Sequence, residues 1–287
     1  MLRARDVMTV DREARGGLLI AGSVALLGVA MLLSLSVGPT GITLASLPRV
    51  LVALFTGSDD PAVAREYLVL VDLRLPRTLL GAFVGASLAI AGAMMQGLFR
   101  NPLADPGLIG VSSGAALAAV ATIALGNTFA APWVKLLGVY ALPFAAFFGG
   151  LAATLVLVSV AGRHGQLMVG TLLLAGIAVA AFASALTGLL SYTSDDRELR
   201  DLTLWSMGSL SGASWPKVIA TLPFAAAVAL AVPRLVRGLN GFLLGEAEAF
   251  HMGIDVEATK RLAIAISAAA VGAAVAVAGV VGFVGIV

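Results

Sequence analysis

The stretch RLPRTLLGAFVGASLAIAGAMMQGLFRNPLADPGLIGVSSGAALA, residues 74–118, holds two apolar segments on either side of a short polar turn. The segments are residues 78–99 and 106–126, each about as long as the roughly 20 residues that a helix needs to cross a bilayer. Between them, the Asn, Asp, Pro and Gly residues of NPLADPG interrupt helical structure. The stretch therefore predicts two membrane-spanning helices joined by a tight turn.

The same pattern continues on both sides of this stretch. Hydrophobic residues make up 60% of the chain and charged residues 12%, whereas soluble domains carry about 25% charged residues. Further segments that are nearly free of charge and long enough to cross a membrane are residues 16–37, 136–161, 167–192, 215–232 and 262–287. Backbone polar groups in hydrocarbon must be satisfied within each segment, and the alternation of a transmembrane barrel is absent. The predicted fold class is all-α, a polytopic transmembrane helical bundle.

The composition also limits the chemistry of the chain. With no cysteine, the chain has no disulfide, no thiolate metal site and no cysteine nucleophile. The net charge is only +2, and the basic residues occur in short clusters and not in a stripe that would bind nucleic acid. No G-x-x-x-x-G-K-[ST] loop for ATP phosphates is present. We therefore expect no metal site, no cofactor and no nucleic-acid partner for this chain.

An intramembrane enzyme is an alternative from another class. Residues 110–114, GVSSG, fit the G-x-S-x-G pattern of a nucleophile elbow, which needs a preceding strand and His and acid partners. Here the pattern opens an apolar helix, and the two histidines, His164 and His251, fall in predicted cytoplasmic loops. No ionisable residue falls well inside a span, which also argues against an ion-coupled carrier. We predict that the chain has no catalytic residues.

The basic residues predict the orientation. The first span is too long for a signal-peptide core and lacks an obvious cleavage site, so we expect a real helix there. A cytoplasmic N-terminus places most basic residues inside, as the positive-inside rule prefers. They are Arg3, Arg5, Arg12, Arg15, Arg100, Arg163, Arg234, Arg237, Lys260 and Arg261. We expect a multi-pass protein of the bacterial inner membrane. The sequence stops at Val287 inside an apolar run, so we expect the natural chain to continue; a C-terminus on the far side of the membrane is the alternative.

Two polar stretches between the spans predict short helices. Residues 239–254 should hold a cytoplasmic helix with Leu243 and Phe250 on one face and Gly253 as its cap. Such a helix could insert into a groove on a partner protein or lie on lipid. Residues 191–214 should hold a second short helix on the external face, because Leu199, Leu202 and Trp205 recur at helical spacing.

Three blocks of the sequence resemble one known family. Residues 74–118 look like the signature region of the FecCD family, the permeases of type II ABC importers. LLLAGIA at residues 172–178 and LLGEAEAFHMGI at residues 243–254 agree with the same family. Locally, residues 194–215 most resemble the haem-importing permeases. The resemblance implies about ten transmembrane helices per subunit, of which this chain would hold roughly seven or eight within a single permease domain, residues 1–287.

The resemblance also implies a function and partners. The chain would form the translocation pathway for haem, or alternatively for a ferric siderophore or cobalamin, at the two-fold axis of a homodimer surrounded by membrane lipid. A cytoplasmic ABC ATPase dimer would bind ATP and Mg and drive transport. A periplasmic substrate-binding protein would deliver the cargo.

Carried onto this sequence, the resemblance assigns roles to single residues. The binding protein would dock on Arg74 and Arg77, where opposite charge sets encounter rate and register, although snorkelling at a helix end is an alternative. The cytoplasmic gate would consist of Asn101, Leu103, Met168 and Val169. The coupling helix, within residues 239–254, would meet the ATPase through Gly245, Glu246, Ala249, Phe250 and Gly253. Haem propionates at the external mouth would meet Arg197 and Arg200.

Overall fold

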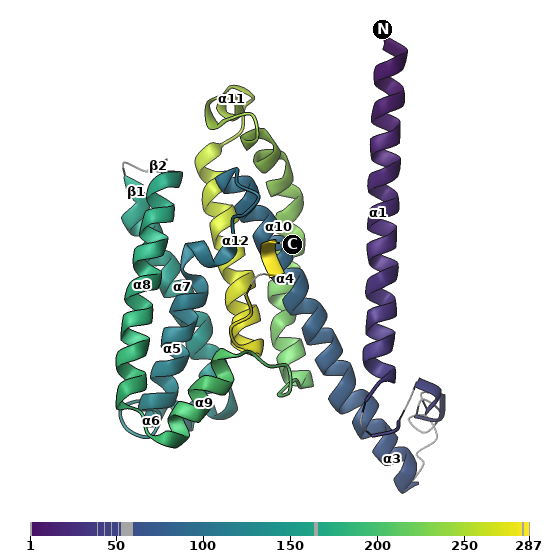
Figure 1. The fold of residues 1–287 in the computed structure, drawn as a ribbon, viewed down its shortest axis with the longest axis vertical. Coiled ribbons are helices and arrows are strands. Elements are labelled where there is room, and N and C mark those ends of the chain that lie inside the picture. The colour runs from purple at the N-terminus through teal and green to yellow at the C-terminus, as the bar shows by residue number, and fades with distance from the viewer. Residues whose placement is uncertain are drawn as a thin grey trace. The chain divides into compact units, whose positions relative to one another are not determined.

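The computed structural model describes residues 2–38, 40–42, 44–46, 48–50, 52, 60–163, 166–282 and 284–286. Within these residues the regular structure is helical except for one hairpin, in which β1 (Gly162–Arg163) pairs antiparallel with β2 (Gln166–Leu167) (Figure 1). The predicted all-α helical bundle is therefore confirmed. The chain divides into two compact units, Met1–Leu79 and Leu80–Val287, and the division falls inside helix α4 (Leu75–Phe99).

The first unit begins with one long helix, α1 (Leu2–Ser36), followed by a short 3-10 turn, η1 (Leu44–Ser46). The part Arg15–Ser36 is apolar and long enough to cross a membrane, and none of its most hydrophobic window is buried. A helix that is hydrophobic on all sides needs an apolar environment, which lipid supplies. The structure agrees with the first predicted span.

A second helical run follows in the first unit. Asp60 is the N-cap of helix α3 (Pro61–Tyr67). Its carboxylate accepts a hydrogen bond from the N–H of Ala62 at 2.9 Å. The run continues without a break through a π-helical stretch, η2 (Leu68–Arg74), into α4. The whole run, Pro61–Phe99, is 39 residues long, which exceeds what a bilayer requires. The predicted second span is thus the last part of a longer helix.

The second unit is a helical bundle. Its long helices after α4 are α5 (Val111–Leu125), α7 (Ala141–Ala161), α8 (Val169–Thr193), α10 (Trp215–Phe242) and α12 (Val256–Ala278). Its short elements are η3 (Pro106–Ile109), α6 (Ala131–Leu137), η4 (Gly138–Tyr140), α9 (Asp196–Ser206), α11 (Glu246–His251) and η5 (Val284–Ile286). Helix α11 and the β1–β2 hairpin lie at one end of the bundle, at the top in Figure 1, and α6 and α9 lie at the opposite end.

The long helices match the predicted spans. Among the described residues, six helical runs are long and apolar enough to cross a membrane, and α5 is a shorter apolar helix of 15 residues. These seven runs correspond one by one to the seven segments that the sequence singled out. The chain is therefore a multi-pass membrane protein. Several predicted boundaries differ from the ends of the helices; helix α10, for example, continues to Phe242 and not only to residue 232.

Glycine conformation accounts for two of these differences. Helix α5 begins at Val111 and not at residue 106, because Gly110 is left-handed (φ +72°) and separates the helix from the 3-10 turn η3. Helix α12 ends at Ala278 and not at residue 287, because Gly279 has a φ of +74°. The carbonyl oxygen of Ala278 instead accepts a hydrogen bond from the N–H of Ser209 at 2.7 Å. The last predicted span is thus shorter than its apolar sequence.

Helices α5 and α7 approach each other through glycines. A Cβ atom on Gly149 of α7 would overlap the Cβ of Ala118 and lie 2.5 Å from the carbonyl oxygen of Gly114. A Cβ on Gly114 would in turn overlap the Cβ of Ala153. Small residues let membrane helices pack this closely. The second glycine of the GVSSG sequence therefore serves helix packing.

Replacing Gly149 with alanine should destabilise the bundle, because the added methyl group has no room between α5 and α7. Overpacking of this kind costs about 1–3 kcal/mol. We expect a lower midpoint of thermal aggregation in detergent, measured by size-exclusion chromatography of heated samples. Gly188 in α8 is the matched control, since a Cβ there meets nothing within 4 Å. Gly188→Ala should hold or raise the midpoint, and equal midpoints for both variants would contradict the close packing.

Candidate functional site

The short helix α11 is fixed by a glycine at each end. Gly245, which precedes it, has a φ of +117° and a ψ of 153°, a conformation that residues with a Cβ rarely adopt. Gly253 is left-handed (φ +77°), and its N–H donates to the carbonyl of Phe250 at 2.9 Å. The N–H of Ile254 donates to the carbonyl of Ala249 at 3.0 Å, which completes a Schellman-type cap. The predicted short helix and its cap at Gly253 are confirmed.

The region around α11 has large apolar side chains on its surface. Leu243 and Leu244 are 66% and 68% exposed, and Phe250 and Met252 are 69% and 47% exposed. In contrast, Ala249 is fully buried. Contiguous exposed apolar side chains with polar neighbours mark surfaces that bind other molecules. We call Leu243, Leu244, Phe250 and Met252 the apolar ridge.

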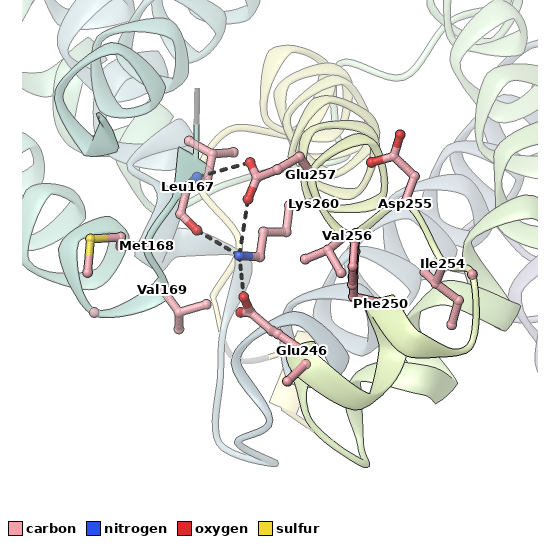
Figure 2. A pocket seen from close by; sticks show the side chains of 13 residues that line it. Leu167, Met168, Val169, Glu246, Phe250, Ile254, Asp255, Val256, Glu257 and Lys260 are labelled. Atoms are coloured by element: carbon pink, nitrogen blue, oxygen red, sulfur yellow. Dashed lines mark hydrogen bonds and ion pairs between the residues drawn. The ribbon is translucent and has the colours of Figure 1, made fainter. Parts of the chain in front are cut away.

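A pocket of about 970 Å³ lies beside α11 (Figure 2). Its walls come from the start of α8, from α11 and from the start of α12. The residues with predicted roles that line it are Met168, Val169, Glu246, Phe250 and Gly253. The structure thus brings together residues that the sequence analysis assigned separately to a gate and to a coupling helix.

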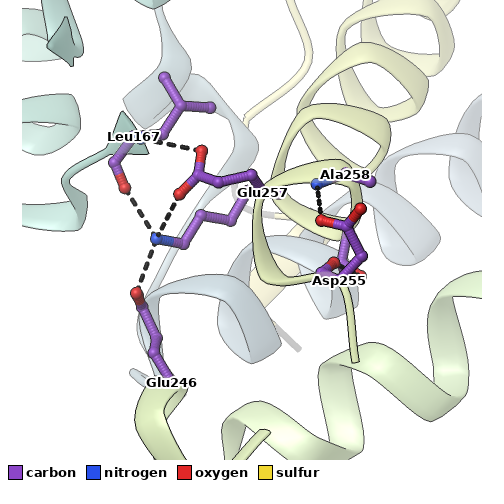
Figure 3. Close-up of polar contacts among 7 residues, drawn as sticks. Leu167, Glu246, Asp255, Glu257 and Ala258 are labelled. Carbon is purple, nitrogen blue, oxygen red and sulfur yellow. Dashed lines mark hydrogen bonds and ion pairs between the residues drawn. The ribbon is translucent and has the colours of Figure 1, made fainter. Parts of the chain in front are cut away.

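A buried lysine lies in the wall of this pocket. The side chain of Lys260 is 3% exposed, and its Nζ donates to the carbonyl of Leu167 at 2.7 Å and to Glu246 at 2.7 Å (Figure 3). Glu257 lies 3.5 Å from the same Nζ, and its other carboxylate oxygen accepts a hydrogen bond from the N–H of Leu167 at 3.0 Å. The charge of a buried ammonium is tolerable only with such partners. We call Lys260, Glu246, Glu257 and Leu167 the Lys260 network.

The Lys260 network is not apparent from the sequence, in which Lys260 is one of the basic residues that predict orientation and Glu246 is only part of the predicted coupling helix. Glu246 lies 14 positions from Lys260 and Leu167 lies 93 positions away, so no local pattern connects them. Glu257, three positions before Lys260 on the same helix, has the one spacing that could have suggested a pair.

Comparison with protein families establishes the kinship of the chain. The model of the FecCD transport family matches residues 26–287. The chain belongs to the FecCD transport family. The resemblance seen in the sequence is thereby confirmed.

Relatives of this FecCD chain carry names with different cargoes. The cobalamin import system permease protein BtuC of Halobacterium salinarum is 45% identical over 215 residues, which cover 75% of this chain and 56% of that protein. The hemin transport system permease protein HmuU of Yersinia pestis is 44% identical over 217 residues, which cover 76% of this chain and 64% of that protein. This chain therefore spans less than two thirds of the length of either relative.

A solved structure supports the fold assignment. It is described as an inward-facing conformation of a metal-chelate type ABC transporter, and its chain superposes on this one with a TM-score of 0.75 at 29% sequence identity. The similarity covers 94% of this FecCD chain and 78% of the solved chain. The helical arrangement described above is therefore one that a known transporter also adopts.

The other two predicted gate residues of this FecCD chain lie in the turn after α4. The side-chain oxygen of Asn101 accepts a hydrogen bond from the N–H of Leu103 at 2.9 Å, which stabilises the turn. The side chain of Leu103 is 71% exposed. Neither residue lines the pocket beside α11. Within one chain, the four predicted gate residues thus form two separate groups.

Arg74 is engaged inside the first unit of the chain. Its side chain is 9% exposed, and its guanidinium donates to the carbonyls of Leu35 at 2.6 Å and Ile42 at 2.9 Å, and to the hydroxyl of Thr40 at 2.9 Å. These bonds hold the end of α1 and the segment after it. Arg77 is exposed. The geometry gives Arg74 a structural role and leaves Arg77 as the exposed member of the predicted docking pair.

Helix α9 carries the two arginines predicted to meet haem propionates. Arg197 and Arg200 are both exposed. The helix starts with a capping box in which the side chains of Asp195 and Glu198 each accept a hydrogen bond from the other's backbone N–H. Leu202 is 5% exposed and anchors the helix. The predicted short helix is confirmed, and it lies at the opposite end of the bundle from α11 (Figure 1).

Replacing Arg74 with methionine should loosen the end of α1 and residues 40–42, because three hydrogen bonds from one buried guanidinium are lost. We expect amide hydrogen exchange there to accelerate by about tenfold, measured by mass spectrometry on the protein in detergent. Arg65→Met, at an exposed arginine of α3, is the matched comparison, and exchange at the end of α1 and in residues 40–42 should stay close to the parent. Unchanged exchange in Arg74→Met would show that these bonds contribute little to holding the segment.

Proposed function

We propose that this chain is the membrane-spanning permease subunit of a type II ABC importer. Membership of the FecCD transport family supports this function. The observation that carries it is the construction of α11, a six-residue helix set between two glycines of positive φ, with an apolar ridge at one end of a membrane-spanning bundle. A short helix flanked by an exposed apolar ridge fits a groove on a partner protein. The partner would be the ATPase that drives transport.

The orientation follows from the distribution of charge. With a cytoplasmic N-terminus in a bacterial inner membrane, α11 faces the cytoplasm and α9 faces outward, in line with their places at opposite ends of the bundle. A cytoplasmic ABC ATPase dimer, which binds ATP and Mg, then contacts α11 through Phe250 and its neighbours. A periplasmic substrate-binding protein docks on the outer side with the help of Arg77. Two copies of the chain form the pathway at their two-fold axis.

Transport by such a dimer requires two arrangements of the helices. Closure of the ATPase pair pushes on α11, and the permease shifts between a state open to the cytoplasm and a state open to the outside. Met168 and Val169 lie in the wall of the pocket beside α11, which supports their role in a cytoplasmic gate. Asn101 and Leu103, in the exposed turn after α4, form the other part of that gate.

For the cargo we propose haem. The support is the local likeness of residues 194–215 to haem-importing permeases and the exposure of Arg197 and Arg200, whose guanidinium groups suit propionates. Cobalamin is the second candidate, because the relative named for cobalamin import is as similar to this chain as the one named for hemin. A ferric siderophore is a further alternative within the same class.

Replacing Phe250 with glutamate should abolish coupling to the ATPase without unfolding the permease. Phe250 is 69% exposed, so the folded chain loses little packing, while a charge on the apolar ridge cannot enter an apolar groove. We expect at least about a tenfold loss of affinity for the ATPase, as for a central interface aromatic. The measurement is co-purification of the tagged full-length permease with its ATPase. Phe250→Leu is the control and should retain binding, and normal transport by Phe250→Glu would remove α11 from the coupling surface.

The cargo test is ATP-dependent uptake into proteoliposomes. The full-length permease, its ATPase and its binding protein are offered haem, a ferric siderophore and cobalamin in parallel. We expect uptake of haem, and a reduction of several-fold when Arg197 and Arg200 are both replaced with glutamine. Uptake of another cargo keeps the importer and discards haem. No ATP-dependent uptake of any cargo would overturn the importer function.

A further inference from the structure

The ammonium of Lys260 connects three segments of the bundle. A lysine has three donors and no acceptor. Here the three partners come from three elements: Leu167 from β2, Glu246 from the first turn of α11, and Glu257 from the first turn of α12. In Figure 2 the side chains of Glu246 and Glu257 point toward the ammonium from two sides, across one wall of the pocket. Helix α11 is thus joined to β2 through a single buried charge.

Leu167 is held by both of its backbone groups. Its carbonyl accepts from Lys260 at 2.7 Å, and its N–H donates to Glu257 at 3.0 Å, while its side chain is 3% exposed. The next residue, Met168, is the N-cap of α8, and Val169 is the first residue of that helix. The position of the Leu167 backbone therefore sets where α8 begins. Any shift of the Lys260 ammonium would be passed to that point.

The three charged side chains of the Lys260 network are buried to different extents, so a partner protein can reach the glutamates but not the lysine. Lys260 is 3% exposed, whereas the side chains of Glu246 and Glu257 are 38% and 29% exposed. Glu246 lies at the start of α11, next to the exposed apolar ridge, so a protein that binds α11 can displace Glu246. Lys260 cannot easily exchange Glu246 for water, because its side chain is 3% exposed and a buried ammonium that loses a carboxylate partner is costly. A displaced Glu246 would therefore draw Lys260 along.

We propose that Lys260 is a positioning residue that transmits movement of α11 to the start of α8, and so to Met168 and Val169. The inference rests on the proposed function, because it requires an ATPase that moves α11. In this mechanism α11 receives the force and α8 carries the gate. The Lys260 network is the physical connection between the two helices. Movement of α11 displaces Glu246, and Lys260 transmits this displacement to the carbonyl of Leu167.

The absence of cysteine in the chain permits a direct test. Gly170, in the first turn of α8, is exposed, and a Cβ there meets nothing within 4 Å, so Gly170→Cys gives the one thiol within residues 1–287, and its labelling is followed in its own peptide by mass spectrometry. Its labelling rate by a charged maleimide is measured on the full-length permease in complex with its ATPase, with and without a non-hydrolysable ATP analogue. In the parent carrying this reporter, we expect the nucleotide to change the rate by about threefold or more. In Lys260→Met the ATPase should still bind, and the nucleotide should no longer change the rate.

Two further variants separate transmission from folding. Glu246→Gln removes the negative charge from one of the three partners of the buried lysine, and it should reduce the nucleotide effect while the protein elutes normally on size-exclusion chromatography. Glu248→Gln, on the same helix with an exposed side chain, is the matched control and should behave as the parent. If Glu246 acts through Lys260, the double variant Glu246→Gln/Lys260→Met should respond no less than Lys260→Met alone.

The possible outcomes distinguish this inference from the proposed function. If the parent permease does not bind the ATPase, both the proposed function and this inference are overturned. If the parent complex forms and nucleotide does not affect the reporter, or affects it equally in the parent, in Glu246→Gln and in Lys260→Met, the inference is overturned and the importer function stands. A nucleotide effect that is lost in Lys260→Met and Glu246→Gln but retained in Glu248→Gln supports the connection.

Discussion

In a lipid bilayer, a backbone N–H or C=O without a partner has no water to bond, and this constraint shapes the whole chain. The apolar segments therefore form helices, because a helix satisfies the hydrogen bonds of its backbone groups within the segment. The helices then associate without a hydrophobic driving force, because lipid is as apolar as their side chains. Close contact must supply the attraction, and it does so where glycines face each other. Gly114 and Gly149 show this between α5 and α7, as does Gly176 of α8, where a Cβ would overlap the carbonyl oxygen of Leu108.

The same constraint explains what happens where the backbone leaves the helical form. The carbonyl of Gly285, in the 3-10 turn η5, accepts a hydrogen bond from the side-chain amide of Gln96 at 3.0 Å, and the turn fits against α4 because residue 92 is a glycine. Arg74 and Lys260 act in a comparable way. Each is buried, and each donates to carbonyl groups outside helices or, at Leu35, in the last turn of one. Basic side chains here bond the parts of the backbone that helices leave unpaired.

These two solutions have different consequences for movement. Glycine contacts between long helices are tight, so a bundle packed in this way shifts between discrete arrangements and does not deform smoothly. A salt bridge between a buried lysine and a partly exposed carboxylate can follow a small displacement of one partner. The Lys260 network lies where the short helix α11 meets the start of α8, which is where a permease driven from outside the membrane needs such a joint. The proposed transport function and the geometry of this joint are therefore physically compatible.

The sequence by itself determined the helical class, the places of the seven apolar helical segments, the two short helices at opposite ends and the family. Each of these depends on local composition, spacing or motif, which hold whatever the distant parts of the chain do. Only the tertiary structure decided where α5 begins and where α12 ends, because the conformation of Gly110 and Gly279 is invisible in an apolar run. It also decided that Arg74 is buried and that Lys260 bonds Leu167, 93 positions away. A charged residue between apolar segments looks the same in sequence whether it meets water or a carbonyl group, and folding alone brings that carbonyl to it.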